Sequence, residues 1–246
     1  MQISWNIGAD GGSGTYLLVG NALRAYITNN FDGTAMTVEL TVEKNDGQLF
    51  LVTLYVDVQA IGPEGSSVGF ATVNGAFHAL TGLHMTLYVI TDRLGLVPVF
   101  TALGFAVLGL VQLIKRKSLL KVDRDILVLG GFYLLVMAAY LLFEEVIINY
   151  RPVLIDGVLE AAYPSSTTIL VLCVMPTAMM QFHKRVKNPQ TRTVIQIITL
   201  AFAAFMVLGR LVSGVHWLTD IVGGILLSAS LVLMYASVNR AIEKAI

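Results

Sequence analysis

Hydrophobic residues are spread very unevenly along this 246-residue chain. Five long apolar runs follow one another near residues 94–114, 126–143, 166–182, 193–212 and 217–238. A helix needs about 20 predominantly apolar residues to cross the hydrocarbon core of a bilayer, and each of these runs is long enough. The pattern therefore predicts an all-α integral membrane helical bundle with five transmembrane helices.

Residues 1–58 have a different pattern. Hydrophobic and polar residues alternate over 36–43, turn-forming residues follow at 44–47, and 49–58 is apolar and rich in strand formers. This predicts a β-hairpin within a short β-rich N-terminal segment. In the alternative, 49–58 is the end of a sixth membrane helix. That alternative is weaker, because ten helical residues cover only about 15 Å of a core that is roughly 30 Å thick.

Residues 59–93 contain a Gly- and Ser-rich loop and then scattered apolar residues. They predict a loop followed by a pair of interfacial helices. His78 and His84 lie in this part and are interpreted as packing or surface residues, since no cysteine or carboxylate stands at metal-binding spacing from them. The expected organisation is thus an N-terminal segment (1–58), a connecting region (59–93) and a transmembrane domain (94–246).

Composition supports this class of protein. The chain is 56% hydrophobic and 13% charged, with a mean hydropathy of +0.75, which is far from the values of a soluble domain. The formal net charge is zero, so no long-range field favours nucleic acid. Cys173 is the only cysteine, which excludes an intrachain disulfide. The first 14 residues are polar and Gly-rich, so no cleavable signal peptide is expected.

Basic residues predict the orientation in the membrane. Eleven of the sixteen lie between the first and second runs, between the third and fourth, or after the fifth. These three places fall on one side of the bilayer, and the positive-inside rule assigns them and the C-terminus to the cytoplasm. The connections 144–165 and 213–216 then face outward, and the expected location is the cell (plasma) membrane.

The connection before the fifth run holds the first candidate chemistry. Arg210 carries donors suited to an oxyanion, and a helix that begins near Ser213 would place His216 and Asp220 on one face. A carboxylate there would orient the imidazole. A structural alternative is that the histidine caps the turn and the arginine extends toward water. Ionisable groups beside hydrocarbon are costly, which favours a functional site.

The connection before the third run adds a second group of candidates. It contains Arg151 and ends in Pro164, Ser165 and Ser166, which are typical of a helix start. The free N–H groups of that first turn would favour an anion, although the simpler role of either serine is to cap the helix. Donors of this kind, together with a histidine nucleophile, suit phosphoryl transfer.

These residues resemble the motifs of the type 2 phosphatidic acid phosphatase (PAP2) superfamily, which are membrane phosphatases acting on lipid phosphates and pyrophosphates. The resemblance covers roughly residues 94–246 and rests on three ordered motifs: Arg151-Pro152, Pro164-Ser165, and the set Arg210, His216 and Asp220. It implies that His216 is the nucleophile and that Asp220 orients it. It also implies that Arg151, Ser165, Ser166 and Arg210 hold the phosphate, without a metal or other cofactor.

The chain departs from the family pattern at two important positions. Glu144 stands where the family has lysine, and this carboxylate would repel a phosphate. Thr167 stands where the family has a second histidine, the general acid, and a threonine cannot give a proton near neutral pH. The reaction rate would decrease least with a pyrophosphate substrate, because phosphate is a good leaving group without protonation. Ser166 and Gly209 are milder departures.

Three hypotheses follow. The first is a membrane phosphatase that hydrolyses a lipid phosphate or prenyl pyrophosphate through a phospho-histidine on the extracytoplasmic face. The alternative is a catalytically impaired protein of the same fold that binds or transports a phosphorylated lipid, which the residues at 144 and 167 favour. A structural membrane protein with coincidental motifs is the third, and the order of the motifs on one side of the membrane argues against it.

Overall fold

The computed structural model describes residues 2–6, 13–17, 53 and 55–244. Strands β1 (Gln2–Asn6) and β2 (Ser13–Leu17) pair as an antiparallel two-stranded sheet. Most of the hairpin predicted over 36–58, namely residues 36–52 and 54, lies outside the described residues. Residues 53 and 55–57 form turns and bends, and residue 58 has no regular structure, so the second predicted strand is wrong for these described residues.

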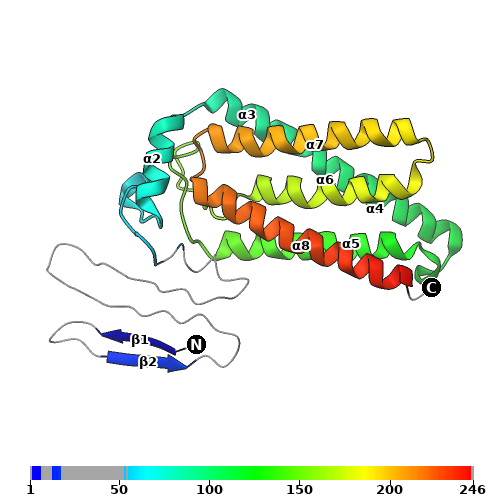
Figure 1. The fold of residues 1–246 in the computed structure, drawn as a ribbon, viewed down its shortest axis with the longest axis horizontal. Coiled ribbons are helices and arrows are strands. Elements are labelled where there is room, and N and C mark those ends of the chain that lie inside the picture. The colour runs from blue at the N-terminus through cyan, green and yellow to red at the C-terminus, as the bar shows by residue number, and fades with distance from the viewer. Residues whose placement is uncertain (1, 7–12, 18–52, 54, 245–246) are drawn as a thin grey trace.

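Long helices make up the rest of the chain and run back and forth along one direction (Figure 1). Five spans of the described chain are long and apolar enough to cross a membrane, which confirms the predicted all-α membrane bundle. The first span also includes a shorter helix, α3 (Met85–Leu94), so it is longer than the apolar run predicted. The long helices are α4 (Leu96–Arg116), α5 (Arg124–Glu145), α6 (Ser166–Arg185), α7 (Pro189–Val212) and α8 (Leu218–Lys244).

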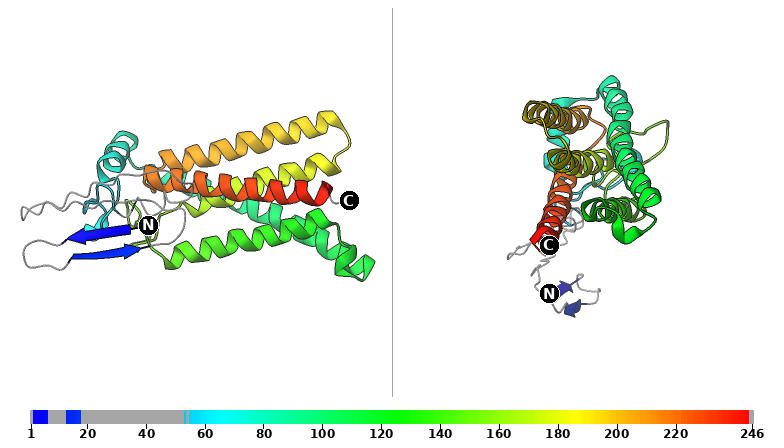
Figure 2. Two further views of the ribbon diagram at one scale, coloured as in Figure 1. Left: turned by 60° about the horizontal axis from the view of Figure 1, so that its bottom comes forward. Right: turned by 90° about the vertical axis from the view of Figure 1, so that its right-hand side faces the viewer.

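Helix α6 is the centre of the bundle. It contacts α4, α5, α7 and α8, and the end-on view in Figure 2 shows the other helices gathered around it. Half of the residues in the most apolar stretch of α6 are buried inside the protein, a larger share than in any of the other four spans. The first turn of α6 is therefore surrounded by other parts of the protein.

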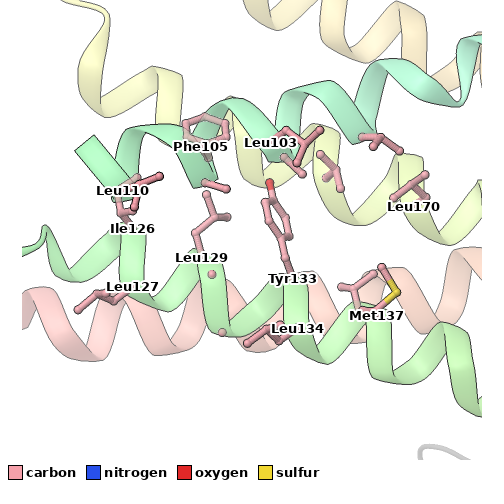
Figure 3. A pocket seen from close by; sticks show the side chains of 18 of the residues that line it. Leu103, Phe105, Leu110, Ile126, Leu127, Leu129, Tyr133, Leu134, Met137 and Leu170 are labelled. Atoms are coloured by element: carbon pink, nitrogen blue, oxygen red, sulfur yellow. The ribbon is translucent and has the colours of Figure 1, made fainter. Parts of the chain in front are cut away.

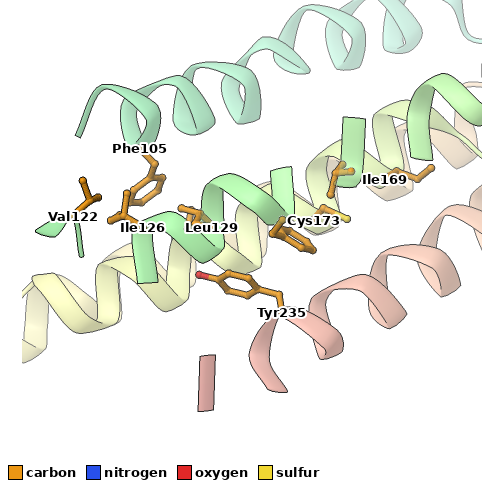
Figure 4. Close-up of a cluster of buried hydrophobic side chains, with 10 residues drawn as sticks. Phe105, Val122, Ile126, Leu129, Ile169, Cys173 and Tyr235 are labelled. Carbon is orange, nitrogen blue, oxygen red and sulfur yellow. The ribbon is translucent and has the colours of Figure 1, made fainter. Parts of the chain in front are cut away.

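Side chains from α4, α5, α6 and α8 form the main hydrophobic core (Figure 4). Leu129 and Cys173 lie between Val122 at one end of the cluster and Ile169 at the other, and Tyr235 reaches in from α8. Apolar side chains also cover the outside of the bundle, as expected where helices face lipid instead of water. Buried hydrogen bonds add specificity, for example from Gln181 to the Tyr235 hydroxyl at 2.6 Å.

Helix α2 (Ala71–Thr81) and α3 cover the end of the bundle where α7 ends and α8 begins (Figure 1). The two helices that the sequence predicted here therefore do form. The His84 N–H donates to the Ser213 carbonyl at 2.9 Å. Gly214 has a φ of +72°, and a Cβ at this position would lie 2.0 Å from the Gly82 carbonyl oxygen, so only glycine fits the approach.

The opposite end of the bundle carries ion pairs at its surface. Arg116 Nη1 lies 2.7 Å from Asp123 Oδ1, and Arg185 Nη1 lies 3.0 Å from Asp125 Oδ2. The hydrogen bond from Arg116, together with Arg185, keeps the pKa of Asp123 below its usual value. These contacts join the α4–α5 connection to the end of α6.

Candidate active site

Arg151 is carried by the connection between α5 and α6, which folds back on itself. Its N–H donates to the Glu160 carbonyl at 3.0 Å, and the Ala162 N–H donates to the Asn149 carbonyl at 2.9 Å. The side chain of Arg151 also pairs with Glu160, with Nε 2.9 Å from Oε2. These contacts hold a buried guanidinium group at the end of the bundle where α6 begins.

The N-terminus of α6 is the second component. Ser165 is the N-cap, and its Oγ accepts from the Thr168 N–H at 3.4 Å and from the Thr168 hydroxyl at 3.1 Å. The Ser165 N–H donates to the Asp220 carbonyl at 3.0 Å, which ties the start of α6 to α8. The first N–H groups of a helix, here including those of Ser166 and Thr167, have no acceptor within the helix, and with the helix dipole they favour an anion.

His216 lies in the turn before α8. The prediction of a helix that begins near Ser213 and carries His216 and Asp220 on one face is therefore wrong. The two side chains still meet, because Asp220 is in the first turn of α8 and points back toward the helix start. Its Oδ2 accepts from the Trp217 N–H at 2.8 Å and lies 3.6 Å from His216 Nδ1.

Three segments that are distant in the sequence meet at His216. Its Nε2 lies 3.3 Å from Arg151 Nη1 and 3.5 Å from Ser165 Oγ. An arginine can only donate, so Nε2 is the acceptor and the ring proton belongs on Nδ1, facing Asp220. Burial, and then the positive charges of Arg151 and Arg210, lower the pKa of His216 well below its usual value. The imidazole is therefore neutral near pH 7, with a lone pair directed at the arginine and the serine.

Arg210 is almost completely buried, with 3% of its side chain exposed. Its Nη2 donates to Thr167 Oγ1 at 2.5 Å and to Asp92 Oδ1 at 3.2 Å. Its Nε and Nη1 have no hydrogen-bond partner among the residues that the structure describes. The Tyr88 ring lies against both arginines, with its centroid 4.9 Å from the guanidinium carbon of Arg210 and 5.9 Å from that of Arg151. Two buried donor groups at a cationic site are thus free to bind an anion.

The two departed family positions lie in different surroundings. Thr167 is part of the site, because its hydroxyl accepts from Arg210. Glu144 is an exposed residue of the last turn of α5 and lies beside Tyr140 on its own helix. The threonine therefore occupies the site directly, whereas the glutamate contacts a residue outside it.

Several residues of the site were not found from the sequence. Asn149 is buried, with Nδ2 3.5 Å from Asp220 Oδ1, and Asn74 of α2 binds the N–H and the hydroxyl of Thr219. Glu160, Tyr88 and Asp92 pair with or stack on the arginines. None of them belongs to one of the recognised motifs, and only the four-residue spacing of Tyr88 and Asp92 indicated that these two share a helix face.

The two remaining histidines at this end have packing roles. His78 Nε2 lies 3.0 Å from the Gly214 carbonyl oxygen, and its ring contacts Trp217. His84 Nε2 lies 2.9 Å from the Thr81 carbonyl oxygen. Within the described ranges, no group of three or more His, Cys, Asp or Glu side chains is placed to hold a metal ion.

A membrane helical bundle that buries two arginines, a histidine and an aspartate at one end defines a class of integral membrane protein with a buried cationic site. Comparison with known proteins then gives the family. A family model described as the PAP2 superfamily matches residues 98–243, which is more than half of the chain. The chain belongs to the PAP2 superfamily, as the resemblance of its motifs predicted, and it is an integral membrane protein.

A solved structure supports the fold. It is described as the first transmembrane PAP2 type phosphatidylglycerolphosphate phosphatase from Bacillus subtilis. The two chains are 20% identical, the TM-score is 0.52, and the match covers 70% of this chain and 87% of that one. No curated protein matches the sequence.

Proposed function

We propose that this protein is a membrane phosphatase that hydrolyses a lipid phosphate or prenyl pyrophosphate through a phospho-histidine intermediate. The observation that carries the proposal is the contact of His216 Nε2 with both Arg151 and Ser165, residues from two other motifs. Such a cluster of buried donors around a neutral imidazole suits in-line attack on phosphorus.

Each residue has a role in this proposal. His216 Nε2 attacks the phosphorus atom, and Asp220 orients the ring and stabilises the positive charge that the phosphorylated imidazole carries. Arg151, Arg210 and Ser165 hold the phosphoryl oxygens, together with the N–H groups of the first turn of α6, which begins at Ser166. Nε and Nη1 of Arg210, which lack a partner in the described part of the chain, are the clearest donors for these oxygens.

An apolar cavity supports a lipid as the substrate (Figure 3). It lies between α4, α5 and α6, has a volume of about 940 Å³ and extends from Leu119 near the far end of α4 to Ser166 and Thr167. Leu103, Tyr133 and Met137 are among the side chains that line it. The same first turn of α6 therefore borders both the cavity and the arginine cluster. A hydrocarbon chain in this cavity would place its phosphate beside Arg210.

The membrane orientation is also part of the proposal. The basic residues gather at the end of the bundle opposite the site, which supports a cytoplasmic C-terminus and a site on the outer face of the cell membrane. Single cysteines at the exposed positions Val158 and Lys187 test this, because the natural Cys173 is buried. A membrane-impermeant maleimide should label Val158→Cys in intact cells and leave Lys187→Cys unlabelled; the reverse result refutes this orientation.

Phosphate release by the purified protein tests the activity. Phosphatidic acid and undecaprenyl pyrophosphate are offered to the wild type and to His216→Ala. We expect release from at least one substrate and a loss on the order of 10⁴-fold or more in the variant, because the nucleophile is gone. Acid-labile labelling of the wild type with ³²P, absent in the variant, would identify the phospho-histidine.

The presence of Thr167 in the site favours one alternative, a protein that binds or transports a phosphorylated lipid without turnover. A threonine bound to Arg210 keeps the anion pocket but cannot protonate a leaving alkoxide. No phosphate release, with lipid binding that Arg151→Ala weakens, would support this alternative over the phosphatase.

A further inference from the structure

Helix α3 lies before the residues that the family model matches, yet it contributes two side chains to the site. Tyr88 and Asp92 are four residues apart and therefore share one face of α3. Tyr88 lies against the guanidinium groups of Arg151 and Arg210, and Asp92 Oδ1 is 3.2 Å from Arg210 Nη2. This helix thus brings a carboxyl group to the phosphate site that the recognised motifs do not include.

We propose that Asp92 is the acid–base catalyst of this site. Its carboxyl group gives a proton to the leaving oxygen, and its carboxylate later takes a proton from the attacking water. The proposal rests on the phosphatase function proposed above.

The need for such a group comes from the chemistry of the leaving oxygen. An alkoxide is a poor leaving group unless it is protonated as the P–O bond breaks, and Thr167 cannot supply that proton near neutral pH. Asp92 and Thr167 bind the same nitrogen atom of Arg210, so the carboxyl group lies within two hydrogen-bond lengths of the Thr167 hydroxyl. A proton donor therefore lies next to the position where one is missing.

Exposure separates Asp92 from the other aspartate of the site. Half of the Asp92 side chain is exposed (52%), whereas the Asp220 side chain is 0% exposed. The second step of the reaction needs an attacking water, which can reach an exposed carboxyl group but not a sealed one. Helix α4 alone is about 32 Å long, enough to cross the hydrocarbon core, so α3 can extend beyond that core.

Glu160 is the rival carboxylate, because it pairs with Arg151 in the same way that Asp92 pairs with Arg210. In-line displacement places the leaving oxygen across the phosphorus atom from the nucleophile. Arg151 contacts His216 directly, so its partner Glu160 is associated with the nucleophile side. Arg210 instead binds Thr167 and Asp92, which favours Asp92 for the leaving group.

The proposed cycle balances. In the first step the bond from His216 Nε2 to phosphorus forms, the ester P–O bond breaks, and the Asp92 proton goes to the released alcohol. In the second step a water oxygen attacks phosphorus, its proton goes to the Asp92 carboxylate, and the P–N bond breaks. A protonated Asp92 can keep its contact with Arg210 through Oδ1 while Oδ2 carries the proton.

Dependence on the leaving group tests the role. Wild type, Asp92→Asn and Glu160→Gln are assayed in detergent with an alkyl phosphate and a nitrophenyl phosphate that carry hydrocarbon chains of the same length. For Asp92→Asn we expect kcat to fall by roughly 10²- to 10⁴-fold with the alkyl phosphate and by less than about tenfold with the nitrophenyl phosphate, whose leaving group needs no proton. Glu160→Gln should change both rates by the same factor, because it acts only by positioning Arg151.

The outcomes separate the two proposals. Equal losses for both substrates in Asp92→Asn, or no loss with the alkyl phosphate, overturn the acid role and leave Asp92 as a positioning residue or an unused one. A wild type that releases no phosphate from these two substrates, from phosphatidic acid or from undecaprenyl pyrophosphate overturns the proposed function itself. Adding Thr167→His to Asp92→Asn gives a positive check, since a histidine at that position should restore alkyl phosphate hydrolysis selectively if a missing acid is the defect.

Discussion

The two ends of the helical bundle hold their charges in different ways. At the α7–α8 end, Arg151, Arg210 and His216 are buried, and Arg210 keeps two donors without a partner in the described structure. At the opposite end, Arg116 and Arg185 are partly exposed and pair with acidic residues. Burying a cation whose N–H donors lack acceptors lowers the free energy of unfolding unless a ligand supplies the acceptors. Paired surface charges cost little and contribute little. The contrast supports the anion site proposed for the α7–α8 end and gives no comparable reason to propose one at the opposite end.

The largest difference between the two ends is expected when one aspartate at each end is replaced by asparagine. Asp220→Asn replaces the carboxyl oxygen that faces His216 Nδ1, so phosphate release should fall by roughly 10³- to 10⁴-fold, as for an aspartate that orients a catalytic histidine. Asp125→Asn, which loses an ion pair with Arg185, should stay within about threefold of the wild type. Initial rates at saturating substrate measure both. Similar rates for the two variants would remove the functional distinction between the ends.

The next largest difference in activity is expected when one arginine at each end of the bundle is replaced by alanine. Arg210→Ala removes donors aimed at the phosphoryl oxygens, and we expect kcat/KM to fall by about 10²- to 10³-fold, as when one transition-state donor is lost. Arg185→Ala at the other end should alter kcat/KM by less than about threefold and mainly change stability. A full rate in Arg210→Ala, with the protein folded by circular dichroism, would exclude this arginine from phosphate binding.

The low pKa of His216 predicts an unusual pH dependence. An imidazole attacks only when neutral, and a pKa below the usual 6.5 keeps it neutral as the pH falls through 6. Between pH 7 and 5.5, kcat/KM for the nitrophenyl phosphate, whose leaving group needs no proton, should change by less than about twofold after correction for substrate ionisation. A histidine with an ordinary pKa would lose about tenfold over the same interval. A tenfold decrease would show that the arginines and burial do not control this group.

The smallest expected effect is at the opposite end. Asp123→Asn removes the ion pair with Arg116, in which both side chains are 41% exposed, so the free energy of unfolding should fall by about 1 kcal/mol or less. The pKa of Asp123 is lowered in the folded protein, so this contribution is present above the pKa of the unfolded carboxyl group and is lost as the pH falls through the folded value. Thermal unfolding of both proteins in detergent at pH 7 and pH 3 measures the difference. A larger loss would mean that this pair behaves like a buried one.

Much of the fold could be predicted from the sequence, because a bilayer demands long apolar segments. The five spans and the start of α6 at Ser166 agree with the predicted runs. The motif residues Arg151, Ser165 and His216 could also be selected from the sequence, since their order resembles a known family, and the fold brings them together. The start of α8 at Leu218 also agrees with the fifth run, but the helix start near Ser213 that would have included His216 does not form, because the turn that carries His216 packs against α2 and α3.

The sequence by itself therefore determined that this chain crosses a membrane several times and carries the ordered motifs of the PAP2 superfamily, since hydropathy and spacing are properties of the chain alone. Only the tertiary structure decided which groups complete the site. Tyr88, Asp92, Asn149 and Glu160 reach it from segments whose local patterns do not distinguish them from surface residues. Their contacts arise because packing places α3 and the α5–α6 connection against the arginines, and no short stretch of sequence encodes that proximity.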